Sequence, residues 1–153
     1  MKNSQAYRWI VEITAALFIL LFVYTGITKL NDRNIFQFVI SKSPLIGNWS
    51  AFLSWSLPIV ELITAFLLFL PATKKTGLWI SLLLMIAFSI YIGYMVLFSP
   101  HLPCSCGGVL KQLTWNQHLA FNIVFTILAV LSLWINKRQQ RFIAINRNSR
   151  KPA

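Results

Sequence analysis

The chain has 153 residues, of which 57% are hydrophobic, 14% aromatic and only 11% charged. Soluble domains are roughly 45–50% apolar and about 25% charged, so a soluble globule of this composition would leave much apolar surface in water. The composition therefore excludes the soluble globular and disordered classes, and the formal net charge of +11 raises the question of a nucleic-acid partner.

Four apolar runs account for the composition, and each is long enough to cross a membrane. A hydrocarbon core about 30 Å thick needs roughly 20 residues of helix at 1.5 Å per residue. The runs are residues 9–28, 51–71, 77–98 and 115–135. The sequence therefore predicts an all-α membrane protein, with a four-transmembrane-helix bundle over residues 1–136 and a basic tail over residues 137–153.

The basic residues are divided unequally between the two sides of this predicted bundle. Ten of the 14 lie on the side of the two termini and of the short connection 72–76, and four lie on the opposite side. Because cytoplasmic flanks carry the positive excess, both termini are predicted to be cytoplasmic. Six of the ten form one short tail after the last run, which indicates an anchor on the lipid bilayer and no nucleic-acid partner.

The first outer connection, residues 29–50, has a helical pattern of its own. Its apolar residues recur at the spacing of one helical face: Ile35, Phe36, Val39 and Ile40. Asn31 or Asp32 can cap the start of such a helix, and Ser43-Pro44 can stop it. We expect a short interfacial helix across the outer mouth of the bundle.

Three ionisable residues fall within the runs or at their ends, where charges are costly and usually have a partner. Glu61 lies ten residues into the second run, about 15 Å deep at 1.5 Å per residue, and is expected to face the interior. It either pairs with Lys29, whose side chain would reach inward from the outer end of the first run, or stays protonated. Glu12 lies near the inner boundary, where Arg8 or the lysines of connection 72–76 can neutralise it.

Both cysteines of the chain, Cys104 and Cys106, lie in the second outer connection, residues 99–114. Two prolines before them and two glycines after them predict a turning segment, and a capping pattern from Thr114 predicts the start of the fourth helix. A disulfide that closes three residues stabilises by only about 1.6 kcal/mol in the chain-entropy model, roughly half the value for a 15-residue loop. The pair is therefore a weak structural link, and the spacing favours a labile, redox-active pair.

The surroundings of the cysteines favour the same interpretation and leave two alternatives open. The loop contains His101 and Lys111 and no acidic residue, and nearby cations favour the reactive thiolate. One alternative is a passive disulfide or idle thiols. The other is a Zn²⁺ or Cu(I) site completed by His101 and His118, although Cys-x-Cys is shorter than the usual spacing of zinc ligands. We predict no metal site.

The chain resembles the MauE family of methylamine-utilisation membrane proteins, within the DoxX-like group of four-helix membrane proteins. The likeness covers about residues 6–136 and is carried by three motifs: Gly26-Ile27-Thr28-Lys29-Leu30, Pro58-Ile59-Val60-Glu61 and Cys104-Ser105-Cys106-Gly107-Gly108. Family members commonly have Phe at the position of Gly107, and Arg where Phe121 precedes Asn122.

The resemblance implies a protein of the bacterial inner membrane whose cysteine loop faces the periplasm. It implies a role in the maturation of a disulfide-containing exported client, in MauE the small subunit of methylamine dehydrogenase, with a periplasmic thioredoxin-like partner. We interpret Cys104 and Cys106 as the exchanging pair of a thiol–disulfide oxidoreductase, with a quinone as the candidate cofactor in the membrane and the direction of electron flow open. The alternatives are a non-catalytic assembly factor or metal chaperone, and a small transporter that uses Glu61 and Lys29. The supporting residues are His101, Gly107, Gly108, Lys29, Glu61, His118 and Asn122.

The predicted topology places the cysteine loop outside the cytoplasm, and this can be tested with a membrane-impermeant thiol reagent. Applied to intact, reduced cells, the reagent should label Cys104 or Cys106. Labelling that occurs only after lysis would reverse the orientation and change the redox compartment of the pair.

Overall fold

The computed structural model describes residues 2–43, 45–98 and 115–148 of the chain. These residues form helices and short connections, without a strand among them. The elements are α1 (Lys2–Asn31), α2 (Arg33–Ser41), a 3₁₀ turn (Gly47–Trp49), α3 (Ser50–Phe69), α4 (Lys74–Phe98) and α5 (Trp115–Asn148).

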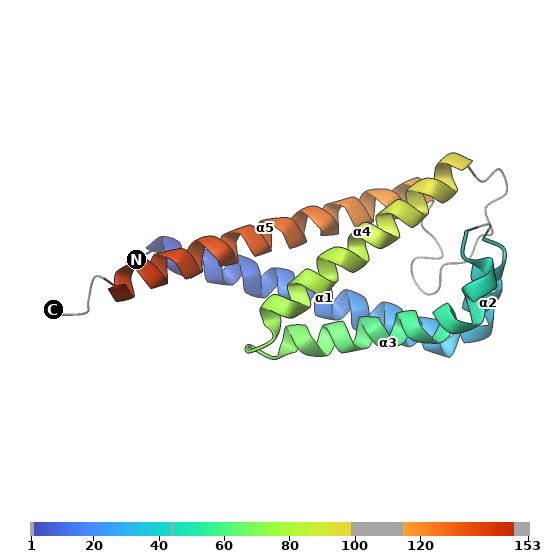
Figure 1. Cartoon of the computed structure of the whole chain (residues 1–153), viewed down its shortest axis with the longest axis horizontal. Helices are drawn as coiled ribbons and strands as arrows, with labels where there is room; N and C mark the ends of the chain where they lie inside the picture. Colours follow the sequence, from blue (N-terminus) through green and yellow to red (C-terminus); the bar gives the residue numbers. More distant parts are fainter. Residues whose placement is uncertain (1, 44, 99–114, 149–153) are drawn as a thin grey trace.

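Helices α1, α3, α4 and α5 form an elongated bundle, and α2 lies across one end of it (Figure 1). Four segments are long and apolar enough to cross a membrane: Arg8–Asn31 in α1, Gly47–Phe69 in the 3₁₀ turn and α3, Lys74–Phe98 in α4 and Asn116–Arg138 in α5. Only 17–39% of the most apolar window in each segment is buried inside the bundle, so most of the apolar surface of these helices faces outwards, as suits contact with lipid. The predicted four-helix membrane bundle is confirmed.

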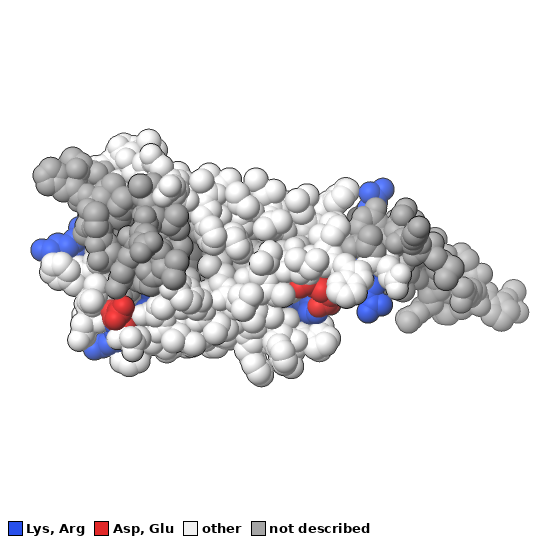
Figure 2. Space-filling view, turned by 180° about the vertical axis from the view of Figure 1, so that it is seen from behind, with Lys and Arg blue, Asp and Glu red and all other residues white. Residues whose placement is uncertain are grey.

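The two ends of the bundle group the segments as the sequence predicted. The N-terminus, the C-terminus and the connection between α3 and α4 lie at one end, and α2 lies at the other, here called the α2 end (Figure 1). On the face shown in Figure 2, the charged side chains lie towards the two ends, and the surface between them is uncharged. Which side of the membrane each end faces stays a prediction.

Helix α2 is the expected interfacial helix and begins after Asp32, one of the two predicted caps, although that side chain makes no capping hydrogen bond. It packs mainly on α3 and on the 3₁₀ turn that leads into α3. Val39 and Ile40 on its inner face are buried, whereas Phe38 is exposed. The helix therefore closes the end of the bundle with one apolar face.

Several helices extend beyond the predicted apolar runs, and two of these differences change a connection or the tail. Helix α4 begins at Lys74, so the connection from α3 is shorter than the predicted segment 72–76. Helix α5 begins at Trp115 as predicted, but it continues to Asn148 through most of the basic tail. Residues 136–148 contain neither Gly nor Pro and several good helix formers, so the sequence offers nothing to stop the helix at residue 135.

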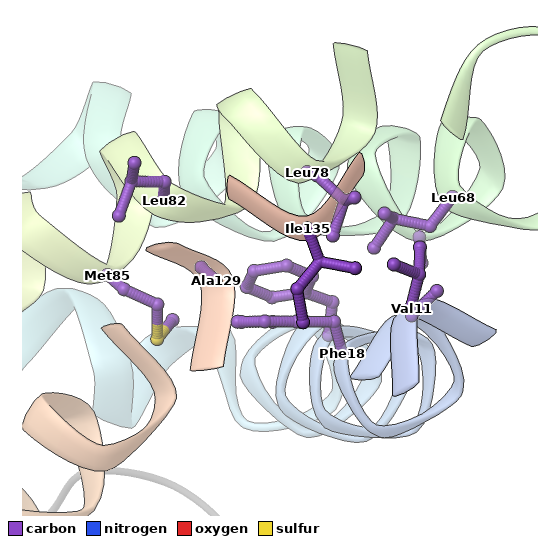
Figure 3. Packing of buried hydrophobic residues seen from close by; sticks show 11 residues of the cluster. Val11, Phe18, Leu68, Leu78, Leu82, Met85, Ala129 and Ile135 are labelled. Carbon is purple, nitrogen blue, oxygen red and sulfur yellow. The ribbon is translucent and has the colours of Figure 1, made fainter. Parts of the chain in front are cut away.

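The apolar core lies between α1, α3, α4 and α5, on the side of the two termini relative to the polar cluster described below. Phe18 is fully buried and meets Phe125 of α5 edge to face, with ring centroids 5.3 Å apart. Figure 3 shows how side chains from all four long helices surround it. The labelled members are Val11, Phe18, Leu68, Leu78, Leu82, Met85, Ala129 and Ile135.

The hairpin of α3 and α4 depends on Gly77, and this generates a prediction. A Cβ at Gly77 would lie 2.9 Å from Cγ of Leu68 and 3.0 Å from its backbone N. Gly77→Ala should therefore lower the thermal midpoint in detergent by several degrees, since overpacking costs about 1–3 kcal/mol.

Gly93, in the same helix, is the matched control because a Cβ there meets nothing within 4 Å. Gly93→Ala should leave the midpoint unchanged or raise it, because Ala is the better helix former by up to about 1 kcal/mol. Equal losses in the two variants would contradict the close packing at Gly77.

Candidate functional site

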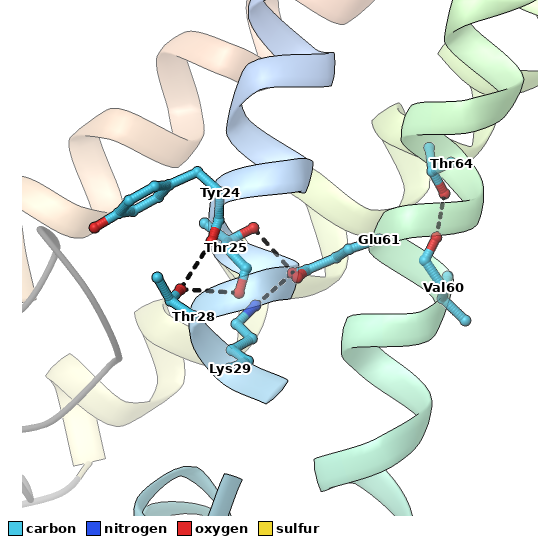
Figure 4. A network of polar contacts seen from close by, with 7 residues as sticks. All are labelled: Tyr24, Thr25, Thr28, Lys29, Val60, Glu61 and Thr64. Carbon is cyan, nitrogen blue, oxygen red and sulfur yellow. Dashed lines mark hydrogen bonds and ion pairs between the residues drawn. The ribbon is translucent and has the colours of Figure 1, made fainter. Parts of the chain in front are cut away.

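A buried polar cluster joins α1 to α3 near the α2 end of the bundle (Figure 4). Glu61 of α3 is only 1% exposed, and its carboxylate accepts hydrogen bonds from Nζ of Lys29 and from Oγ1 of Thr25, the latter at 3.2 Å. Of the two alternatives left open for Glu61, the structure shows contact with Lys29. The acidic side chain is thus neutralised and hydrogen-bonded in a setting where an isolated charge would be very costly.

The local sequence explains how the cluster forms. Thr25 and Lys29 are four residues apart, so they share the face of α1 that meets α3. Gly26 beside them allows the two helices to approach, because a Cβ there would lie 3.1 Å from Cγ of Leu62 and 3.3 Å from the carbonyl oxygen of Pro58. The two sequence motifs that contain Lys29 and Glu61 therefore meet at one helix contact.

The ammonium group of Lys29 also lies over two aromatic rings. Nζ is 5.6 Å from the ring centroid of Phe36 in α2 and 5.0 Å from that of Phe88 in α4. Both distances are within the range of cation–π attraction, which strengthens where the cation is desolvated. Lys29, whose side chain is 15% exposed, thus connects α1 to α2, α3 and α4.

A second acidic residue, Glu12, lies towards the opposite end of the bundle and is much more exposed than Glu61. Lys74 donates to both of its carboxylate oxygens, at 2.6 and 2.7 Å, so one of the predicted partners is confirmed. The side chain of Glu12 is 57% exposed. This pair is a surface contact between α1 and α4, where the expected contribution to stability is small.

A cavity of about 270 Å³ lies beside the buried pair. Its wall is formed by side chains from all five helices and is mostly aliphatic and aromatic. Its polar members include Thr25, Lys29, Glu61, His118 and Asn122. Cavities of this kind, apolar with a few convergent polar groups, are the usual form of a small-molecule site.

His118 and Asn122 enter the site from α5, one helical turn apart. Asn122 is only 4% exposed. Its Nδ2, like Nδ1 of His118, is buried without a hydrogen-bond partner among the residues that the structure describes. The structure therefore brings four predicted supporting residues together around one cavity: Lys29, Glu61, His118 and Asn122.

The remaining predicted site residues lie outside the described residues: Cys104, Cys106, His101, Gly107 and Gly108. The helices that flank this segment, α4 ending at Phe98 and α5 beginning at Trp115, are described. Both of those helix ends lie towards the α2 end (Figure 1).

Sequence reasoning missed several residues of the cavity. Thr25 sits one turn before Lys29, and this spacing was the available signal for its role. Phe88 and Tyr91 of α4 and Phe121 of α5 also line the cavity. They are aromatic residues in apolar runs, and nothing in the sequence separates them from residues that face lipid.

The buried pair predicts a graded response to substitution of Glu61. Glu61→Ala removes the acceptor of two hydrogen bonds and leaves Lys29 without its carboxylate, and loss of one partner of a buried pair costs about 3–5 kcal/mol. Glu61→Gln keeps the shape and can still hydrogen-bond, so its thermal midpoint in detergent should fall less.

Glu12→Ala is the matched control, because that pair is exposed and contributes at most about 1 kcal/mol. The expected order of midpoints is Glu12→Ala, then Glu61→Gln, then Glu61→Ala as the lowest. If Glu61→Ala unfolds at the same temperature as Glu12→Ala, Glu61 is merely tolerated in the interior.

A family model described as "Methylamine utilisation protein MauE" matches residues 7–135. Comparison with curated proteins and with solved structures gave no match. The matched range covers most of the chain and contains the Lys29–Glu61 pair, the cavity residues of α5 and both cysteines. The chain therefore belongs to the MauE family of membrane proteins implied in methylamine utilisation.

Proposed function

We propose that this MauE-family chain is a membrane thiol–disulfide oxidoreductase of the bacterial inner membrane. Its Cys104–Cys106 pair exchanges a disulfide with a periplasmic thioredoxin-like partner and so supports maturation of a disulfide-containing exported protein. The observation that carries the proposal is the placement of the only two cysteines of the chain, one residue apart, in the segment between α4 and α5. The family description adds the metabolic context of methylamine utilisation. The small subunit of methylamine dehydrogenase, which the resemblance implies, is the proposed type of client.

The chemistry of the segment suits exchange better than structural support. The partner's thiolate attacks one sulfur of the Cys104–Cys106 disulfide and forms a mixed disulfide, and the other cysteine leaves as a thiolate. The partner's second thiol then resolves the mixed disulfide, so the partner leaves oxidised and the pair is left as a dithiol. His101 and Lys111 favour the thiolate form, and residues 99–114 contain no carboxylate to oppose them.

The arrangement of the helices supports a periplasmic location of the cysteine segment, which this exchange needs. The ends of α4 and α5 that flank the cysteines lie at the α2 end, away from both termini and from the α3–α4 connection (Figure 1). Ten of the 14 basic residues belong to the segments at the terminal end. By the positive-inside rule, the α2 end is then the periplasmic one.

The buried charges give less support to a transporter. Lys29 and Glu61 neutralise each other inside the bundle, and the helices that carry them are continuous. Transporters of the known repeat folds bind their substrates at interrupted helices in corresponding halves. Pro58 lies within α3, which remains helical on both sides of it.

The exchange predicts that the two cysteines behave differently when they are replaced one at a time. The exchange is reversible, so a lone cysteine thiolate can attack the disulfide of the oxidised partner. With His101 three residues before it, Cys104 is assigned this attacking, partner-facing role. In cells that carry Cys106→Ser, a mixed disulfide with the partner should accumulate through Cys104 and be identified by mass spectrometry. Cys104→Ser is the matched control and should capture little, and capture by neither variant would refute thiol exchange.

The same pair should matter for activity and not for stability. The double variant Cys104→Ser, Cys106→Ser should lose client maturation in cells, while its thermal midpoint in detergent stays within a few degrees of the parent, because so short a disulfide loop stabilises by only about 1.6 kcal/mol. A large fall in the midpoint would indicate a structural disulfide. Destabilisation of the parent by a chelator would indicate a metal site.

A further inference from the structure

The size and wall of the cavity at the α2 end define the kind of molecule that fits. A dry protein cavity of about 150 Å³ accommodates benzene. At about 270 Å³, this cavity has room for a substituted six-membered ring. The rings of Phe22, Phe36, Phe88 and Phe121 lie in its wall, so a flat apolar ring is matched and a strongly hydrated molecule is disfavoured.

The polar groups of the cavity call for hydrogen-bond acceptors on that ring. Both carboxylate oxygens of Glu61 already accept hydrogen bonds, from Lys29 and from Thr25. What remains is a donor: Nδ2 of Asn122 is buried and has no partner among the described residues, and the residue is only 4% exposed. A carbonyl oxygen of a ligand would satisfy this amide.

The charge of the cavity selects against ions. Lys29 and Glu61 are in contact and their charges cancel, so neither a carboxylate nor an amine gains a free counter-charge. The molecule that fits is therefore neutral, apolar, ring-shaped and equipped with carbonyl oxygens. It must also reach a cavity among helices that cross the membrane, as a molecule dissolved in the bilayer can.

From these observations we infer that the cavity binds the ring of a membrane quinone, with one quinone carbonyl accepting a hydrogen bond from Asn122. Nδ1 of His118, one turn away and also buried without a partner in the described part of the chain, lies in the same wall. This nitrogen is placed to form a hydrogen bond with the quinone or with the hydroxyl group formed on its reduction.

A role for this quinone in electron transfer rests on the proposed function. Oxidation of the Cys104–Cys106 dithiol to the disulfide releases two electrons and two protons. Reduction of one quinone to its quinol takes up two electrons and two protons. One turnover therefore regenerates the disulfide that the partner consumes and leaves a quinol in the bilayer.

The binding can be measured on the purified full chain in detergent, titrated with a decyl-substituted benzoquinone. Asn122→Leu keeps the volume of the side chain and removes the amide, so the dissociation constant should rise about fivefold or more. Asn116→Leu, on the exposed surface of the same helix, is the matched control and should bind as the parent does. The thermal midpoint of Asn122→Leu without quinone should not fall, because an unpaired buried amide has been removed.

Three ligands and one further variant complete the test. A ring hydrocarbon without carbonyls, a fatty acid and an alkylamine should each bind more weakly than the quinone. Equal quinone affinity in Asn122→Leu and the parent, or tighter binding of any of these three, would overturn the inference. The Cys104→Ser, Cys106→Ser variant should bind quinone unchanged, so failure of thiol exchange and failure of quinone binding are separate results.

Discussion

The structure is organised around one constraint, which is that a carboxylate buried in a membrane bundle needs a partner. Glu61 is 1% exposed, and the requirement is met by Lys29 and Thr25 of α1. Because Lys29 extends from the end of its helix, its ammonium also lies over Phe36 of α2, which adds a contact from α1 to the packing of the short helix on α3. Gly26 gives α1 and α3 the close approach that the contact needs. The contacts around this buried acid thus involve three helices, α1, α2 and α3.

The cavity and the apolar core lie in different halves of the bundle, and their side chains differ in kind. Around Phe18 the four helices meet mainly through apolar side chains, and the buried polar residues among them, such as Ser81 and Ser132, are small. Beside Glu61 the helices carry polar groups that must remain oriented towards one another, and Asn122 of α5 faces the same space. The cavity is therefore polar at a few points and apolar elsewhere, a combination that serves recognition of a neutral ring better than it serves stability.

The sequence was sufficient for features that depend on local pattern. The lengths of the apolar runs predicted the four membrane spans, and the third run and α4 both end at Phe98. Helical spacing predicted α2. The extension of α5 was missed because the prediction ended the helix where the apolar run ended, whereas residues 136–148 merely lack a helix breaker. The boundary of a membrane segment and the boundary of a helix are different physical quantities.

Features that depend on how helices are rotated and paired were beyond the sequence. The sequence left two alternatives for Glu61, pairing with Lys29 or staying protonated, and the contact with Lys29 emerged only from the structure. Phe88 and Phe121 face the cavity while Ile86 and Ile123, two residues away in each helix, are exposed to the lipid side. Hydrophobicity cannot separate these neighbours, because both environments are apolar. Asn122 was named from the family motif, and its position beside the buried pair emerged only from the packing of α5.

Together, the proposed thiol exchange and the inferred quinone site make the Cys104–Cys106 pair and the buried cavity one redox unit. In the most direct measurement, the purified chain is reduced, and the reductant and oxygen are removed. A fully ring-substituted benzoquinone with a decyl tail is then added, and quinol absorbance is followed together with alkylation of the thiols. We expect Cys104 and Cys106 to become resistant to alkylation as one quinol appears per chain. Thiols that stay fully alkylatable while the quinone remains oxidised would contradict this expectation.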